Sequence, residues 1–310
     1  MKLSIIVSLF NEESAVRAFF ESLVEVLKDY VNYEIIFVND GSTDNTLKII
    51  TEFTRKNKHV KSISFSRNFG HEAAMLAGID HAKGEVLICM DGDLQHPPKM
   101  IPDMLKRYEK GDVDIINMVP TRIKSVSSKW FYKVINLISP VAVEANASDF
   151  FLISERVAKI LQKSYRERVR FLRGYIQMMG FKKVSLSFEL EDRQFGSSKY
   201  SFSKLFSLSL TAIATLSKFP LQLGIYVGFL SGLFGIILAV YSIIMKIIEQ
   251  PVSGYTTIIV FLSLMFSALF FILGVIGVYI GFLFDEQKKR PIYIIESTNN
   301  IEHENEIIIG

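Results

Sequence analysis

Two carboxylates separated by one glycine, Asp91 and Asp93, are the most informative chemical feature of the sequence. They follow the apolar run VLICM, so they lie where a buried strand is expected to end. Carboxylate oxygens are the ligands that Mg²⁺ and Mn²⁺ prefer, often with a substrate phosphate completing the coordination. A solvated turn is the alternative, because such triplets occur by chance in loops. The strand-end position and the following LQHPP favour the metal site.

Polar residues also follow the first two apolar runs of the chain. Asn11 and Glu12 come after LSIIVSLF, and Asn39-Asp40-Gly41-Ser42 comes directly after EIIFV. In open parallel sheets, ligands bind at the carboxyl ends of the strands, so these groups are expected to share one site with Asp91. The sequence has no GxGxxG after the first run and no GxxxxGK[ST], which argues against a dinucleotide site and a P-loop.

The elements that must position these residues alternate regularly between short apolar runs and amphipathic stretches. This alternation predicts an α/β fold with a doubly wound, mostly parallel sheet covered by helices on both faces. The expected strands are LSIIVSLF, EIIFVND, VKSISFS, EVLICMD and DVDIINM, and the expected helices are 13–30, 44–55, 71–81 and 98–110.

The charge distribution divides the chain into two parts. Of its 310 residues, 49% are hydrophobic and 22% are charged, but only Lys246 and Glu249 carry charge between Phe219 and Phe284. About 20 apolar residues cross a bilayer, so this region predicts two transmembrane helices, at about 221–245 and 257–283. Two buried core helices are the alternative, which the length and apolarity disfavour.

Basic residues flank this apolar region on its outer sides, and the turn between the spans offers only Lys246. By the positive-inside rule, the large N-terminal part and both termini are expected in the cytoplasm. The flanking residues are Lys199, Lys204, Lys218, Lys288, Lys289 and Arg290.

The rest of the composition excludes several classes. A single cysteine, Cys89, excludes a disulfide framework and a cysteine zinc site, and fits a reducing compartment. A net charge of +3 is too small to indicate nucleic-acid binding. The five histidines show no HExxH or paired metal spacing, which predicts mostly surface positions; His71 alone has a donor-site position as an alternative.

These patterns predict four segments: 1–199, a cytoplasmic α/β domain; 200–218, an amphipathic juxtamembrane helix; 219–284, the two transmembrane helices; and 285–310, a cytoplasmic tail. The 200–218 helix is expected in the membrane interface, with packing on the soluble domain as the alternative. The tail after Glu296 is expected to be poorly ordered. Glycines at every fourth residue of the spans predict close packing of one span on the other, or a homo-oligomer.

Five motifs, in order, resemble those of family-2 glycosyltransferases with the GT-A fold, in particular the polyprenyl-phosphate hexose synthases. They are SIIVSLFNEE, FVNDGSTDNT, SRNFGHEAAMLAGIDHAKGE, MDGDLQHPP and RQFGSSKYS. YIGFLFDEQKKRPIYII resembles the end of the second span in bactoprenol-type enzymes, so the resemblance covers nearly the whole chain.

The resemblance implies a role for each matching residue on the donor side. Asp40 would contact the nucleotide base, in a pocket lined by Leu9, Asn11 and Glu12. Asp91 would help to bind the nucleotide, while Asp93 and Gln95 would bind Mg²⁺ or Mn²⁺, with Asp91 beside them. The donor's diphosphate would be held by Arg193 and Lys199, with Ser198 next to them.

On the acceptor side, the resemblance implies that Asp149 is the residue usually assigned as the catalytic base. Arg168, Arg170 and Arg173 match a basic segment that would collect the acceptor phosphate, and a solvated helix face is their alternative. A phosphate monoester has a second pKa near 6, so a lipid phosphate is already an oxyanion nucleophile at neutral pH. We therefore expect Asp149 mainly to orient the acceptor.

The expected function is that of an inverting glycosyltransferase in the bacterial inner membrane. It would move a hexose, glucose from UDP-glucose, to undecaprenyl phosphate for cell-surface polysaccharide modification. Another donor sugar is the alternative: N-acetylglucosamine, mannose from a GDP-sugar, or a modified arabinose. A processive synthase would need a QxxRW-type motif and more spans, which the sequence lacks, and a non-catalytic lipid-carrier binding protein is the remote alternative.

Overall fold

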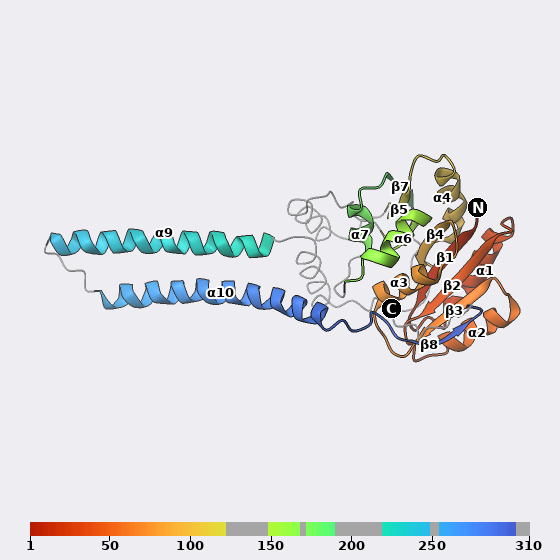
Figure 1. The fold of residues 1–310 in the computed structure, drawn as a ribbon, viewed down its shortest axis with the longest axis horizontal. Helices are drawn as coiled ribbons and strands as arrows, with labels where there is room; N and C mark the ends of the chain where they lie inside the picture. Colours follow the sequence, from red (N-terminus) through yellow and green to blue (C-terminus); the bar gives the residue numbers. More distant parts are fainter. Residues whose placement is uncertain (122–147, 168–171, 190–218, 249–253, 302–310) are drawn as a thin grey trace. The chain divides into compact units, whose positions relative to one another are not determined.

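A computed structural model of the chain describes residues 1–121, 148–167, 172–189, 219–248 and 254–301. The chain divides into two compact units, Met1–Phe206 with Arg290–Gly310, and Ser207–Lys289 (Figure 1). The predicted juxtamembrane helix at 200–218 lies outside the described residues.

The first unit is built on an eight-stranded sheet with the order β7-β5-β6-β4-β1-β2-β3-β8. β1 lies in the middle and pairs in parallel with β2 and β4, whereas β6 and β8 run antiparallel to their neighbours. The mostly parallel sheet and its first five strands are as the sequence predicts. The strands are Leu3–Leu9 (β1), Tyr33–Asn39 (β2), Val60–Phe65 (β3), Val86–Asp91 (β4), Ile115–Pro120 (β5), Phe151–Ser154 (β6), Lys183–Phe188 (β7) and Ile295–Asn299 (β8).

Helices cover both faces of this sheet, which explains why its central strands are almost continuously apolar. All seven residues of β1 are buried: Ile5 and Val7 face one core with α1, α2 and α4, and Ile6 faces another with α3, α6 and α7. The helices are Val16–Leu27 (α1), Thr46–Lys56 (α2), His71–His81 (α3), Pro98–Met100 (the 3₁₀-helix η1), Ile101–Tyr108 (α4), Glu155–Ser164 (α6) and Leu172–Met178 (α7).

The segment after residue 290 returns to this sheet and corrects one prediction. The sequence favours a poorly ordered tail after Glu296, but Ile295–Asn299 forms β8, antiparallel to β3. Tyr293, 1% exposed, stacks on Phe65 at 5.2 Å between ring centroids and donates a 2.6 Å hydrogen bond to Asp80. An edge strand gains its backbone hydrogen bonds without burying its own side chains, so its polar sequence concealed it.

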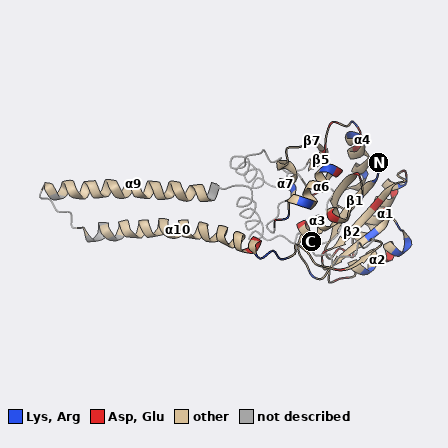
Figure 2. Ribbon diagram, in the orientation of Figure 1, with Lys and Arg blue, Asp and Glu red and all other residues tan. Residues whose placement is uncertain are grey.

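The described part of the second unit contains two apolar helices, Phe219–Ile247 (α9) and Tyr255–Gln287 (α10). Within them, Leu221–Met245 and Val260–Gln287 are candidate membrane spans by length and composition. Figure 2 shows charged residues throughout the sheet unit and almost none along these helices. Gly224 and Gly228 face Ile272, so part of the predicted glycine stripe does pack one helix on the other.

Candidate active site

The Asp91-Gly92-Asp93 loop lies directly against the end of β1. A Cβ atom on Gly92 would come within 2.4 Å of the Cδ2 atom of Leu9, a buried core residue. Only a residue without a side chain allows this close approach. Within the loop, the Gln95 backbone N–H donates a 3.1 Å hydrogen bond to Asp93 Oδ1. The fold thus brings Leu9 and the predicted metal-binding loop together.

The loops after β1 and β2 are tied to each other by side chains. Asn11 donates its backbone N–H to Ser42 Oγ at 3.0 Å, and its side-chain oxygen accepts the Thr43 N–H at 2.8 Å. The Glu12 N–H donates to Thr46 Oγ1 at 2.9 Å. Asn11 and Glu12 therefore lie at the same edge of the sheet as the end of β2, as predicted for one donor site.

Asp40 is only 2% exposed, and its carboxylate points towards the start of α3. It accepts hydrogen bonds from the backbone N–H groups of Phe69 at 2.6 Å and Gly70 at 3.0 Å. Gly70 has a φ of 98°, which favours glycine. The Asp40 carboxylate thus fixes the backbone immediately before His71. Its contact with a nucleotide base stays a prediction.

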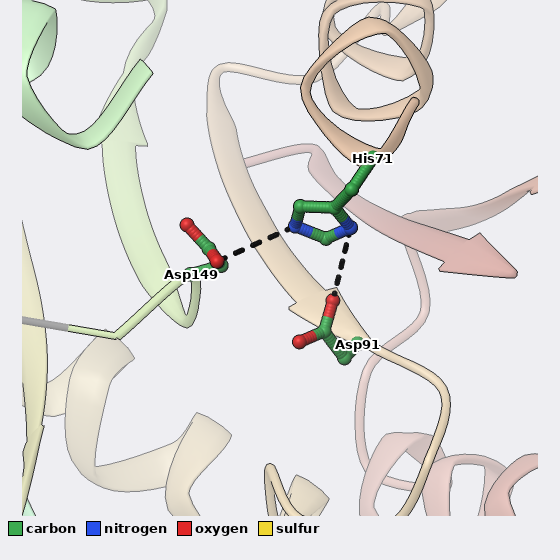
Figure 3. Close-up of side chains that lie close together, drawn as sticks. All are labelled: His71, Asp91 and Asp149. Atoms are coloured by element: carbon green, nitrogen blue, oxygen red, sulfur yellow. Dashed lines mark ion pairs between the residues drawn. The ribbon is translucent and has the colours of Figure 1, made fainter. Parts of the chain in front are cut away.

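His71 lies between two carboxylates that are far apart in the sequence (Figure 3). Its Nδ1 atom is 2.8 Å from Ser8 Oγ and 3.5 Å from Asp91 Oδ1, and its Nε2 atom is 3.5 Å from Asp149 Oδ2. Ser8 also donates to Asp91 Oδ1 at 3.3 Å. A carboxylate oxygen of Asp91 lies within 4.8 Å of one of Asp149. Two negative charges at this distance repel each other by on the order of 3 kcal/mol at an effective dielectric constant of about 20.

Arg173, on α7, pairs with the other oxygen of Asp149 at 2.7 Å from its Nε atom. This is the predicted acceptor-side arginine, and the fold brings it to the predicted acceptor-side carboxylate. Burial raises the pKa of Asp149, but Arg173 and His71 outweigh burial and hold that pKa well below its usual range. Asp149 is therefore a weak proton acceptor in this arrangement.

The charges around His71 favour its protonated form. Burial lowers the pKa of His71, but Asp91 and Asp149 outweigh burial and raise it to about 10. One ligand atom from each of His71, Asp91 and Asp149 lies within 4.8 Å of the other two, a spacing that would allow a shared metal ion. Asp91 and Asp93 offer hard oxygen ligands on one loop, so the donor set fits Mg²⁺ or Mn²⁺.

The structure corrects the surface prediction for His96, and it places His71 beside Asp91 and Asp149, in keeping with the alternative that the sequence left open. His96 is 5% exposed, accepts the Asp91 backbone N–H at 3.0 Å and stacks on Phe150. His71 is half-buried within the site. The NFGHE motif was the sequence signal for His71.

Five predicted site residues lie outside the described part of the chain, so their positions stay predictions. They are Arg168 and Arg170 on the acceptor side, and Arg193, Ser198 and Lys199 on the donor side.

Comparison with known proteins establishes the family. Residues 4–179 match the family model described as Glycosyl transferase family 2. The chain belongs to this family. It is 35% identical over 305 residues to the bactoprenol glucosyl transferase of Shigella phage SfV, covering 96% of this chain and 99% of that protein. It is 36% identical over 304 residues to the prophage bactoprenol glucosyl transferase homolog of Escherichia coli K12, again covering 96% and 99%.

A solved structure supports the fold of this family-2 chain. The glucosyl-3-phosphoglycerate synthase of Mycobacterium tuberculosis, in complex with phosphoglyceric acid, superposes with a TM-score of 0.52 at 15% identity, covering 69% of this chain and 78% of that one. The chain is a glycosyltransferase with a fold of the GT-A type, followed by two apolar helices. The family resemblance, the fold class and the enzyme class predicted from the sequence are confirmed.

Proposed function

We propose that this glycosyltransferase transfers glucose from UDP-glucose to undecaprenyl phosphate at the cytoplasmic face of the bacterial inner membrane. The observation that carries the proposal is the similarity to bactoprenol glucosyl transferases over 96% of the chain, which includes both apolar helices. A lipid acceptor explains why a nucleotide-sugar domain is joined to two candidate membrane spans.

On the donor side, Asp91, Asp93 and Gln95 would hold Mg²⁺ or Mn²⁺ beside the diphosphate of the sugar nucleotide. A bound divalent ion supplies Lewis-acid stabilisation of the departing diphosphate. Arg193 and Lys199, with Ser198, would add positive charge and hydrogen bonds to the same leaving group. The nucleotide would lie against Leu9, Asn11, Glu12 and Asp40 at the ends of β1 and β2.

On the acceptor side, the phosphate needs orientation more than deprotonation. Its second pKa near 6 leaves it mostly dianionic at neutral pH, so an oxygen is ready to attack. That oxygen bonds to the anomeric carbon while the bond from this carbon to the diphosphate breaks, and the electron pair leaves with UDP. The ion pair with Arg173 supports a role for Asp149 in orienting the acceptor phosphate through this arginine, with Arg168 and Arg170 nearby in sequence.

The test is a donor panel with the purified full chain, undecaprenyl phosphate and Mg²⁺ or Mn²⁺. We expect UDP-glucose to label the lipid, and Asp93→Ala to reduce labelling at least 100-fold. Labelling from N-acetylglucosamine, mannose or arabinose donors alone would contradict the choice of glucose. If no donor labels the lipid and Asp93→Ala equals the wild type, the enzyme proposal is wrong.

A further inference from the structure

We propose that His71 is a positioning residue that holds the carboxylates of Asp91 and Asp149 at a fixed separation, and that it is not a metal ligand. The inference rests on the proposed function for the roles of these two carboxylates, one on the donor side and one on the acceptor side. Its geometric basis is the placement of the ring between them (Figure 3).

The sheet itself places the two carboxylates opposite each other. β4 and β6 are antiparallel, with Cys89 paired to Phe151, so continuing the register by two residues brings Asp91 opposite Asp149. Like charges directly opposite each other on neighbouring strands destabilise the pair. We therefore expect a side chain that contacts both carboxylates to hold them at a fixed separation, and the His71 ring lies 3.5 Å from an oxygen of each.

The imidazole is held in a position to fill that role. Asp40 fixes the backbone at Phe69 and Gly70, immediately before His71 at the first position of α3. Ser8 Oγ contacts Nδ1, so the ring is held from β1 as well as from its own helix. The two ring nitrogens lie on opposite sides of the ring and face one carboxylate each, a pairing that a side-chain amide cannot reproduce.

The same helix also fixes the arginine that pairs with Asp149. Glu72, the residue after His71, accepts the backbone N–H of Leu172 at 2.8 Å, and Arg173 is the next residue on α7. The first turn of α3 thus positions Asp149 from two sides, directly through His71 and indirectly through the start of α7. A small displacement of this turn would separate the donor-side carboxylate from the acceptor-side pair.

The experiment is a double-mutant cycle in the full chain with His71→Gln, Asp149→Asn and the combination. His81→Gln, at the other end of α3, where the His81 Nδ1 atom lies 2.8 Å from the Ala77 carbonyl oxygen, is the matched control. We expect His71→Gln to lower kcat about 30-fold, with the KM for UDP-glucose changed less than threefold. The double variant should lie within threefold of Asp149→Asn, because that substitution already removes one of the two carboxylates that His71 joins.

Mn²⁺ affinity, measured by electron paramagnetic resonance, separates positioning from ligation. We expect the Mn²⁺ dissociation constant of His71→Gln to stay within threefold of the wild type. A tenfold or greater weakening would show a metal ligand and overturn the proposal. So would multiplied kcat losses in the double variant, or a His71→Gln enzyme within twofold of the wild type and of His81→Gln.

Thermal unfolding gives a result that does not depend on transfer. His71→Gln should lower the midpoint by a few degrees, because two carboxylates then face each other, and adding Asp149→Asn should recover part of that loss. A double variant no more stable than His71→Gln would contradict the proposal that His71 joins the two carboxylates. If the wild type transfers no sugar to any lipid phosphate, the proposed function fails, while this cycle still decides whether His71 joins the two carboxylates.

Discussion

At the scale of single residues, buried charges in this protein are stabilised by several partners at once. Glu34 is 3% exposed and accepts hydrogen bonds from Lys61 Nζ at 2.6 Å, the Lys83 N–H at 2.6 Å and the Ser4 hydroxyl. Burial raises the pKa of Glu34, but these hydrogen bonds outweigh burial and lower it below its ordinary value. The ionised form of Glu34 therefore stabilises the sheet.

Replacing Glu34 with Gln should destabilise the full chain by about 2 kcal/mol at pH 7. Because the folded pKa is lowered, this stabilisation is present above the ordinary pKa of a glutamate and is lost as the pH falls through the folded pKa. The difference between variant and wild type in thermal midpoint should therefore shrink at acidic pH. The exposed Glu25→Gln is the control, and a difference that is constant with pH would contradict the assignment.

The glycine between the two metal-loop carboxylates gives a second prediction. In Gly92→Ala, the new methyl group would overlap Leu9 and lie 3.2 Å from the Val7 side chain, so the loop must shift. A displacement of about 1 Å at the reacting groups reduces turnover on the order of 100-fold. We expect a loss of this size in sugar transfer with a nearly unchanged thermal midpoint. Adding Leu9→Val should restore part of the activity. If it restores none, the overlap with Leu9 is not the cause of the activity loss in Gly92→Ala.

Sequence motifs could single out Asp91, Asp93, Asp149 and Arg173 as candidates, because their residue types and order resemble the family. They could not identify the role of His71. That role depends on the register of β4 against β6 and on the placement of α3, which join residues distant in the chain. The same holds for Asp40, whose backbone contacts at Phe69 and Gly70 follow from the tertiary fold.

At the scale of secondary structure, the C-terminal strand completes the catalytic sheet. Tyr293 precedes β8, stacks on Phe65 of β3 and bonds Asp80 of α3, which also pairs with Arg166 at 2.9 Å. Beyond the strand, Asn300 donates to the carbonyl oxygens of Thr54 and Val60. A segment that follows α10 is thus part of the core of the first unit.

Removing the Tyr293 ring should therefore destabilise the catalytic unit. Tyr293→Ala is expected to cost about 3–5 kcal/mol, as for other large buried aromatic residues, and to lower the thermal midpoint by about 10 °C. Tyr293→Phe, which loses only the hydroxyl, should cost about 1–2 kcal/mol. Equal midpoints for Tyr293→Ala and the wild type would show that the C-terminal segment does not stabilise the sheet.

The elements that the sequence predicted best are those buried on both sides. β1 to β5 are apolar runs bounded by turn residues, and α3 begins and ends at the predicted residues, His71 and His81. β8 has the sequence IESTN, with polar, partly exposed side chains and no strict alternation. Its place is decided by pairing with β3, a long-range interaction that local patterns do not encode.

At the scale of the whole molecule, the chain divides into a charged sheet unit and an apolar helical unit. The described parts of α9 and α10 are largely apolar and exposed, and the charged residues of the described chain lie mainly in the sheet unit, with a few at the end of α10. The orientation in a membrane follows from basic residues at the two outer ends, including Lys288, Lys289 and Arg290. We propose this orientation from the charge pattern alone, because a pair of apolar helices could cross the membrane in either orientation.

Reporter fusions test that orientation directly. If both termini face the cytoplasm, as the charge pattern predicts, green fluorescent protein fused after Gly310 should fluoresce and alkaline phosphatase fused there should be inactive. Phosphatase inserted in the turn between the helices, after Ser253, should be active. The opposite pattern would place the catalytic unit outside the cytoplasm and contradict the proposed access to UDP-glucose.

The most direct test of the central claim is the chemical identity of the product made by the purified full chain. With UDP-glucose, undecaprenyl phosphate and Mn²⁺, phosphorus and proton NMR should show the phosphate monoester converted to a glucosyl phosphodiester. Because the proposed attack inverts the α-linked donor, the product should be β-linked. An α-linked product, or release of free glucose with the lipid phosphate unchanged, would contradict the account.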